Sequence, residues 1–263
     1  MAVVTLLTDF GSRDHFAAAM KGVMLGIDPG LTLVDVTHDI PRGDVRAGAF
    51  TLAQCCFLFP PGTVHLAVVD PGVGGGRKAL AVAAGGHRFV APDNGILTPV
   101  FESCADFEAH EIAPGRAGRY FRQPVSATFH GRDVFAPVAA WLCRGVPLEQ
   151  LGPPLRDPVQ LPSPQALPAR DGRGAFIQGA VLAVDRFGNL VTNLRPSDVA
   201  TPCEIEVGGR VIRALRQTYA EGAPGEVFAV QGSAGYVEIV MRDGSAAEAL
   251  QLTAGAPVRC NLS

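Results

Sequence analysis

The stretch VHLAVVDPGVGGGR, residues 64–77, joins an apolar run to a loop of glycines. The run 64–69 predicts a buried strand, which must end after Asp70 because the proline that follows cannot continue a ladder. The glycines permit positive φ angles and close approach of a ligand to the backbone. An acidic residue at the carboxyl end of a strand lies where α/β proteins usually bind their ligands. A solvated turn capped by Asp70 is the alternative.

The segments on either side of this stretch alternate between strands and helices. Ser12 or Asp14 is expected to cap the first helix. The alternation predicts an α/β N-terminal domain with a mostly parallel sheet covered by helices. The predicted elements are strands over 3–7 and 31–37, helices over 15–27, 45–57 and 134–142, and a hairpin over 79–90.

A change in composition marks the second half of the chain. Residues 152–172 are dense in proline, which predicts a semi-extended linker. Strand-forming runs follow, with a helix only over 245–250, and they predict a smaller all-β, barrel-like C-terminal domain. The domains are therefore expected over 1–151 and 173–263, joined by that linker.

Composition limits the class of protein. The 263 residues are 48% hydrophobic and 18% charged, enough for a large core, and the net charge of −3 argues against a nucleic-acid partner. The sequence has no apolar run long enough for a membrane span and no basic segment typical of a signal peptide, which favours a cytoplasmic protein. The cysteines show no CxxC spacing and predict small buried thiols without metal: Cys55, Cys56, Cys104, Cys143, Cys203 and Cys260.

Several motifs carry candidate chemistry. Asp9 ends the first strand and could accept hydrogen bonds from a ribose diol, or simply cap a helix. His130, in FHGRD, precedes a helix and is the stronger histidine candidate, and His38 is the other. The loop 185–189 (DRFGN) has the composition of a binding loop or of a turn. A phosphate cradle is disfavoured because neither GxGxxG nor a P-loop lysine is present. The remaining histidines are predicted to be structural: His15, His65, His87 and His110.

Taken in order, the motifs resemble one family. It comprises the S-adenosyl-L-methionine (SAM) hydroxide adenosyltransferases, which are adenosine-forming SAM hydrolases, and their halide-using relatives, the fluorinase and chlorinase. The resemblance extends over the whole chain. The matching motifs are TDFG at 8–11, VDVTH at 34–38, FPPGTVHLAVVDPGVG at 59–74, APDNG at 91–95, FHGRDVFAPVAA at 129–140, DRFGNLVTN at 185–193 and GSAGYVEI at 232–239.

This resemblance implies a catalytic set of Asp70, Arg77 and His130 around a nucleophilic water. The halide enzymes resemble this chain but have tyrosine where Asp70 stands, and the fluorinase has serine where Gly131 stands. A carboxylate would repel a halide, so the resemblance implies in-line attack of water at the ribose 5′ carbon of SAM. The products would be adenosine and L-methionine. The sulfonium leaves as a neutral thioether, so no cofactor and no metal are expected.

The resemblance also implies a set of substrate-binding residues. The set is Asp9 for the ribose diol, Asp14 and Asp185 for the methionine ammonium, Ser233 for its carboxylate, Phe187 and Tyr219 as aromatic walls near the adenosine, Asn189 at the adenine edge, and Glu238 nearby. The family often has asparagine before the serine, and the halide enzymes have arginine after it. Gly232 and Ala234 occupy these positions here, so backbone groups are expected to contribute more to carboxylate binding.

The residues leave open which group takes the proton from water. A carboxylate paired with arginine is a weak base, so either Asp70 or His130 could take a proton or only orient the water. The alternative functions are a chlorinase-like halide adenosyltransferase and a non-catalytic SAM- or adenosine-binding protein. The family resemblance further implies a homotrimer, with each active site between one subunit's N-terminal domain and a neighbour's C-terminal domain.

Overall fold

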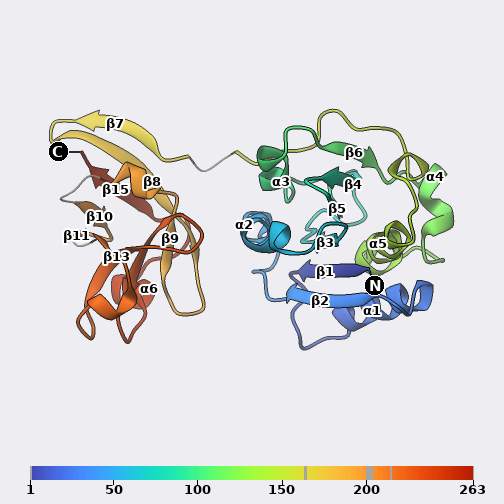
Figure 1. The fold of residues 1–263 in the computed structure, drawn as a ribbon, viewed down its shortest axis with the longest axis horizontal. Coiled ribbons are helices and arrows are strands. Elements are labelled where there is room, and N and C mark those ends of the chain that lie inside the picture. Colours follow the sequence, from blue (N-terminus) through green and yellow to red (C-terminus); the bar gives the residue numbers. More distant parts are fainter. Residues whose placement is uncertain (1, 163–164, 200–203, 214, 263) are drawn as a thin grey trace. The chain divides into compact units, whose positions relative to one another are not determined.

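The computed structural model describes residues 2–162, 165–199, 204–213 and 215–262. The chain divides into two compact units, Met1–Leu161 and Pro162–Ser263 (Figure 1). Cys203 lies outside the described residues. Of the other cysteines, which are free thiols, Cys56 and Cys260 are buried as predicted and the rest are partly buried.

The first unit is built on one six-stranded sheet with the order β2-β1-β3-β5-β4-β6. The pairs among β2, β1, β3 and β5 are parallel, whereas β4 pairs antiparallel with both β5 and β6. The sheet is therefore mixed rather than mostly parallel, because the tight turn at Gly85-Gly86 folds β4 and β5 into a hairpin. The strands are β1 Val3–Thr8, β2 Thr32–Thr37, β3 Val64–Val68, β4 Ala79–Ala84, β5 His87–Pro92 and β6 Glu108–Glu111.

Helices cover both faces of this sheet (Figure 1). On β1, Leu6 packs with Met20 of α1 and with residues of α5, whereas the next residue, Leu7, packs with Leu52 of α2 and with α3. This change of face follows from the two-residue period of a strand. The helices are α1 Phe16–Ile27, α2 Val45–Cys55, α3 Thr98–Ser103, α4 Pro114–Ala117 and α5 Ala136–Cys143.

The starts of these helices differ in how they are capped. Asp44 caps α2 by accepting a hydrogen bond from the backbone N–H of Ala47. The expected capping of α1 by Ser12 or Asp14 is wrong, because His15 occupies the N-cap position and makes no side-chain capping bond. A π-helical turn, Gly131–Phe135, precedes α5 and carries the chain from His130 into the helix.

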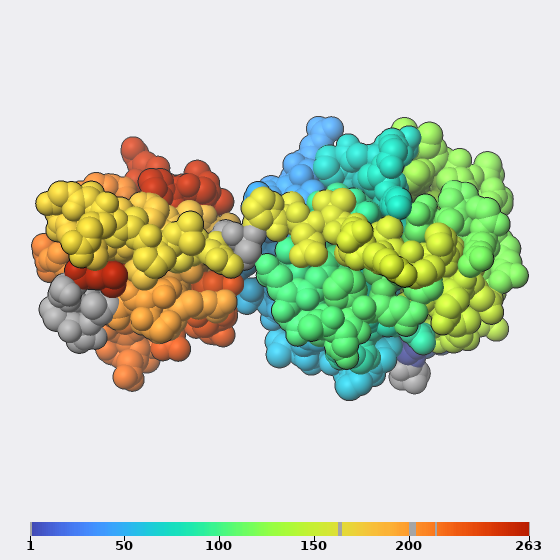
Figure 2. Space-filling view, turned by 90° about the horizontal axis from the view of Figure 1, so that it is seen from above, coloured from blue at the N-terminus to red at the C-terminus, as the bar shows by residue number. Residues whose placement is uncertain are grey.

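The proline-rich segment after α5 follows the surface of the first unit, where Figure 2 shows it in yellow-green. The carbonyl of Pro153 accepts from the N–H of Glu111, and the N–H groups of Val159 and Leu161 donate to the side chains of Asp93 and Thr98. Farther along the chain, β7 (Leu167–Asp171) pairs with β8 in the second unit. No helix in the described ranges combines the length and apolarity needed to cross a bilayer.

The second unit is rich in strands and forms one curled sheet, half of a barrel, with the order β11-β10-β15-β8-β9-β14-β13-β12 and β7 beside β8. Its core is apolar and includes Leu190, Val237 and Val258. The short helix α6 (Ala246–Leu250) is capped by Ser245. The remaining strands are β8 Gly174–Val184, β9 Leu190–Thr192, β10 Ile205–Val207, β11 Arg210–Ile212, β12 Leu215–Arg216, β13 Val227–Gln231, β14 Val237–Met241 and β15 Pro257–Asn261.

Candidate active site

The loops that follow β1, β2 and β3 meet at one edge of the first sheet. In the parallel ladders Thr8 pairs with Val68, so Asp9 and Asp70 both follow strand ends at this edge. The loops are also bonded to one another: the N–H of Gly11 donates to the carbonyl of His38 across 2.7 Å. The sequence pattern predicted this arrangement, because parallel strands present their carboxyl ends together.

Asp70 and Arg77 form a close ion pair at the two ends of the glycine loop. Nε of Arg77 donates to both carboxylate oxygens across 3.0 and 3.1 Å, and Nη2 donates to Oδ2 across 2.5 Å. The Asp70 side chain is 5% exposed and that of Arg77 is 14% exposed. A Cβ at Gly72 would lie 3.3 Å from Cγ of Arg77, so glycine leaves the room in which the arginine folds back over the loop.

His130 completes a cluster with this ion pair. Nη2 of Arg77 lies 2.9 Å from Nδ1 of His130, and the Arg77 guanidinium stacks over the ring of Phe135, 5.2 Å from its centre. The structure thus brings the three predicted catalytic residues together, although 53 positions separate Arg77 from His130 in the sequence.

The arginine fixes the proton on the histidine. A guanidinium has only donors, so Nδ1 of His130 must be the acceptor of this bond, and the proton of the neutral imidazole lies on Nε2. Burial and the nearby charge of Arg77 hold the pKa of His130 below its usual value, and they outweigh the opposing effect of Asp70 and Asp133. Both effects favour the neutral ring.

Gly131, beside this histidine, is in close contact with two apolar side chains. A Cβ here would lie 3.2 Å from the ring of Phe10 and 3.3 Å from Sδ of Met20. A side chain at position 131 would therefore require Phe10 or Met20 to shift by a few tenths of an ångström.

A loop over residues 122–130 packs against the glycine loop. A Cβ at Gly74 would lie only 2.3 Å from the carbonyl oxygen of Ala127, so only glycine permits this contact.

The completely buried carboxylate of Asp133 holds the same loop in place. It accepts from both Nε and Nη2 of Arg132 across 2.7 Å, from Arg122 across 3.2 Å and from the N–H of Ser126 across 2.9 Å. This residue is not among the predicted site residues.

Two predicted binding residues of the first unit lie before α1. Asp9 is half-buried, and its Oδ2 accepts a hydrogen bond from the N–H of Gly43 across 2.8 Å. Gly43 has a φ of +70°, and a Cβ there would lie 3.7 Å from Pro71, so this loop also adjoins the loop that begins at Asp70. Asp14 is exposed, two residues before the helix.

In the second unit, Asp185 organises the loop between β8 and β9. Its Oδ1 accepts from the N–H groups of Phe187 and Asn189, and its Oδ2 accepts from the side-chain amide of Asn189, each across 2.8 Å. The turn expected as one alternative for this segment is therefore present. It leaves the Phe187 ring 77% exposed. Gly188 is packed so closely that a Cβ would lie 2.1 Å from Oγ of Ser245.

Tyr219 and Glu238 form a second group in this unit. The tyrosine hydroxyl donates to Oε2 of Glu238 across 3.1 Å. Burial, with the charge of Glu238 next, raises the pKa of Tyr219 to about 12, and burial raises the pKa of Glu238. Asp185 contributes to both shifts, so these three predicted residues lie within electrostatic reach of one another. A Cβ at Gly232 would lie 1.9 Å from Oε1 of Glu238, so a side chain at position 232 would require the Glu238 carboxylate to move.

Ser233 lies exposed in the turn between β13 and β14. Arg195, which sequence analysis missed, reaches the same turn. Its Nη1 donates to the carbonyl of Gly235 across 3.2 Å, and its guanidinium lies 3.9 Å from the centre of the Tyr236 ring. No local pattern points to this cation, because 38 positions separate Arg195 from Ser233.

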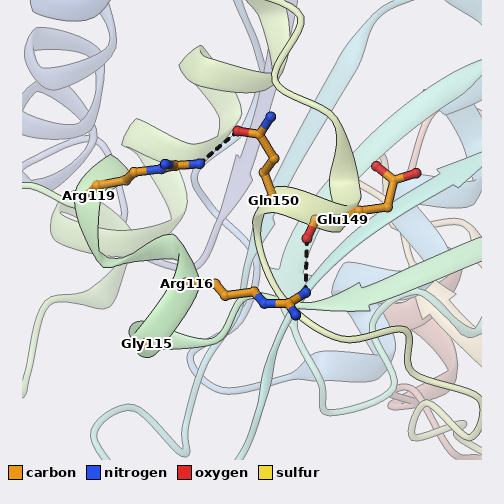
Figure 3. Close-up of a pocket in the computed structure, with 5 residues that line it drawn as sticks. All are labelled: Gly115, Arg116, Arg119, Glu149 and Gln150. Atoms are coloured by element: carbon orange, nitrogen blue, oxygen red, sulfur yellow. Dashed lines mark hydrogen bonds between the residues drawn. The ribbon is translucent and has the colours of Figure 1, made fainter.

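Two surface pockets differ in their relation to the predicted residues. Figure 3 shows a pocket of the first unit in which Arg119 donates to the side chain of Gln150 and Arg116 donates to the carbonyl of Glu149. No predicted site residue lines it. A pocket of the second unit is lined by residues 184–188 and by α6 with its flanking residues, and it therefore includes Asp185 and Phe187. Among the described residues, no group of three metal-ligating side chains is assembled.

These features define a two-unit protein whose first unit presents an aspartate, an arginine and a histidine at the carboxyl edge of a sheet. The sequence model described as the SAM hydroxide adenosyltransferase N-terminal domain matches residues 4–152, and the model of the corresponding C-terminal domain matches residues 179–259. The chain therefore belongs to the SAM hydroxide adenosyltransferase family, as the resemblance of its motifs predicted.

Comparison with individual proteins agrees with this family. The chain is 41% identical over 263 residues to the (R)-S-adenosyl-L-methionine hydrolase of Thermus thermophilus, covering 98% of this chain and 99% of that one. It is 28% identical over 297 residues to a fluorinase of Actinopolyspora mzabensis, covering 99% and 97%. The crystal structure of an uncharacterized conserved protein from Thermotoga maritima superposes with a TM-score of 0.88 at 34% identity, covering 98% of this chain and 100% of that one.

Proposed function

We propose that this protein hydrolyses SAM to adenosine and L-methionine. One observation carries the proposal: the Arg77 guanidinium joins the Asp70 carboxylate to Nδ1 of His130 at the edge of the sheet. The family membership and the 41% identity to a SAM hydrolase support the same reaction.

The proton on His130 determines the roles within the cluster. Because Nδ1 accepts from Arg77, the imidazole offers an N–H at Nε2 and has no free lone pair with which to take a proton from water. His130 therefore donates to the oxygen of the attacking water and orients it. Asp70 offers only acceptors, so it accepts a hydrogen bond from the same water and then its proton.

The atoms and electrons of the proposed reaction balance without a cofactor. The water oxygen bonds to the ribose 5′ carbon, the bond from that carbon to sulfur breaks, and its electron pair stays on sulfur. Methionine leaves as a neutral thioether, and the water proton passes through Asp70 to solvent. The reacting cluster is neutral overall, with one negative and one positive side chain and a neutral histidine, so the substrate cation meets no net repulsion.

Water is the favoured nucleophile over halide for two reasons found in this chain. The Asp70 carboxylate would repel an anion at the position of attack. The serine that the fluorinase places beside its histidine is replaced here by Gly131, where a side chain would require the Phe10 ring or the Met20 thioether to shift. A chlorinase-like reaction and ligand binding without turnover are the competing functions.

Substrate binding is proposed to use both units of the chain. Asp9 would accept from the ribose diol, Asp14 and Asp185 would face the ammonium, and Arg195 would add a positive charge for the carboxylate beside Ser233. The remaining proposed contacts to adenosine are those of Phe187, Asn189, Tyr219 and Glu238.

We further propose a cytoplasmic homotrimer, in which the two sets of residues at one site come from neighbouring subunits. Light scattering that gives a monomer would contradict this assembly.

The reaction is tested by incubating the purified protein with SAM in chloride-free and in chloride buffer. Chromatography should show equal amounts of adenosine and methionine in both, and Asp70→Ala should lower the rate by about 100-fold or more. Predominant 5′-chloroadenosine in chloride would favour the halide enzyme. Tight binding of SAM without any product would favour a binding protein.

A further inference from the structure

His38 is the one candidate histidine to which the proposed reaction assigns no role. It follows β2, it is 9% exposed, and both of its ring nitrogens have partners. Nδ1 lies 2.8 Å from Oγ1 of Thr8, and Nε2 lies 3.0 Å from Oδ1 of Asp35. A histidine held at both nitrogens has its ring orientation fixed.

The hydrogen bonds around His38 form a chain that links Thr8, His38, Asp35 and Lys21. Oδ2 of Asp35 accepts from Lys21 across 2.6 Å. Burial acts to raise the pKa of Asp35, but the bonds from Lys21 and His38 outweigh it and hold that pKa below its usual value. The ionised carboxylate only accepts, so Nε2 of His38 donates to it. In the tautomer that carries its proton on Nε2, Nδ1 accepts the hydroxyl proton of Thr8.

This chain of bonds ends at the loop that carries Asp9. Oγ1 of Thr8 also accepts from the N–H of Phe10 across 3.3 Å, so the threonine side chain contacts the backbone on the far side of Asp9. The carbonyl of Thr8 accepts from the N–H of Ile40 across 3.3 Å. The backbone on both sides of Asp9 is therefore held, and the N–H of Gly43 holds one oxygen of its carboxylate.

The Asp9 carboxylate keeps acceptor capacity for a ligand. Gly43 occupies one of its roughly four lone-pair positions. Two neighbouring hydroxyls of a ribose can be met by the remaining positions only if the carboxylate plane has the right orientation, because a hydrogen bond weakens steeply when it is misaligned.

We propose that Thr8 and His38, supported by Asp35 and Lys21, are positioning residues for recognition of the ribose diol. They act through Asp9 and touch no substrate atom themselves. The inference rests on the proposed function, since it takes a nucleoside with a vicinal diol as the ligand. It assigns a role to residues that are not part of the catalytic cluster.

The same strand provides a matched control. Thr5 of β1 also pairs with a buried histidine: its Oγ1 lies 2.8 Å from Nδ1 of His65. Thr5 lies three residues before Thr8, away from the carboxyl edge of the sheet. Thr5→Val and Thr8→Val therefore remove the same group from the same kind of pair, but only the second change reaches the Asp9 loop.

The experiment measures binding of adenosine and of 2′,3′-dideoxyadenosine by calorimetry. Wild type should bind adenosine more tightly than the dideoxy compound. Thr8→Val should weaken adenosine binding by about tenfold, equivalent to about 1.4 kcal/mol, and leave dideoxyadenosine binding unchanged. Asp35→Ala, at a partly exposed position on β2, should show the same pattern at about threefold. Thr5→Val should leave the Kd of both ligands unchanged.

Results from the Thr8→Val variant and from the wild type would each overturn the inference. If Thr8→Val weakens both nucleosides equally, or weakens neither, the relay has no role in recognition of the diol although the proposed ligand stands. If the wild type binds neither nucleoside, or binds both equally, the diol adds nothing to recognition and the positioning role is overturned, whereas the proposed function is decided separately by the hydrolysis of SAM.

Discussion

Nδ1 of His130 accepts a hydrogen bond from Nη2 of Arg77 across 2.9 Å, while the same nitrogen of the arginine donates to Asp70. One guanidinium therefore orients both an acceptor and a donor for water. The histidine in this arrangement presents an N–H rather than a lone pair, which makes it a donor to the nucleophile and leaves the carboxylate as the proton acceptor.

The first prediction separates a donor from a base at position 130. A glutamine side chain can place an amide N–H near the position of Nε2, but it cannot take a proton at neutral pH. We expect His130→Gln to keep at least about tenfold more activity than His130→Ala, because oriented hydrogen bonding survives. Steady-state kinetics with SAM provides the comparison. Equal loss of activity in the two variants would indicate that His130 is the base.

The second prediction concerns pH. Protonation of His130 at Nδ1 would place an N–H against the Arg77 guanidinium and break their bond. Because burial and Arg77 hold the pKa of His130 below its usual 6.5, the neutral form persists as pH falls past 6.5. The rate should stay level between pH 8 and about 6.5 and fall only at lower pH. A profile that already declines from pH 7.5 to 6.5 would contradict this.

The third prediction concerns Asp133, which fixes the loop leading to His130. Asp133→Asn leaves Arg122 and Arg132 without their buried counter-charge, so the free energy of unfolding should fall by about 3 kcal/mol. The kcat should fall by about tenfold or more, with the KM for SAM within about twofold, because the change displaces the catalytic loop. Chemical denaturation and kinetics measure the two effects.

Asp171→Asn serves as the control for that change, since Asp171 also pairs with an arginine, Arg259, but lies in the second unit on β7. It should leave kcat unchanged. If both aspartate variants lower kcat alike, the effect of Asp133 is a general loss of stability.

The fourth prediction is acid destabilisation through His65. Burial, with a smaller contribution from the charge of His87, lowers the pKa of His65 to about 3. The unfolded chain therefore binds more protons between pH 6.5 and pH 3, and the folded state loses stability as pH falls through this range. The loss should be roughly 3 kcal/mol between pH 7 and pH 4, at about 1.36 kcal/mol per unit.

His65→Gln tests the assignment, because it removes this titration while keeping a polar group near Thr5 and His87. Urea denaturation at several pH values should show a shallower dependence in the variant. Parallel curves for variant and wild type would show that other groups cause the acid sensitivity.

Much of the first sheet could be predicted because its central strands are apolar and regularly separated by helices. The predicted run 64–69 is β3, and the predicted hairpin 79–90 is β4 and β5. By contrast β6, with the sequence EAHE, is short and polar and lies at the edge of the sheet, so it has no apolar pattern. The mixed character of the sheet follows from that edge strand and the hairpin.

The candidate site could be predicted only in part. Asp70 and Arg77 share one loop, and that loop is visible in the sequence. The partners that orient the site are not: Asp133 with Arg122, and Thr8 with His38, join segments whose closeness depends on packing of the whole unit. Sequence patterns report the period of a helix or strand, and they do not report which polar side chains meet across loops.

The most direct test of the central claim follows the oxygen atom. SAM is incubated with the protein in H₂¹⁸O, and the adenosine formed is analysed by mass spectrometry. Attack of water at the 5′ carbon predicts adenosine that is heavier by one ¹⁸O in its 5′-hydroxyl and methionine without label. Unlabelled adenosine, or a 5′-halogenated nucleoside as the main product, would contradict the account.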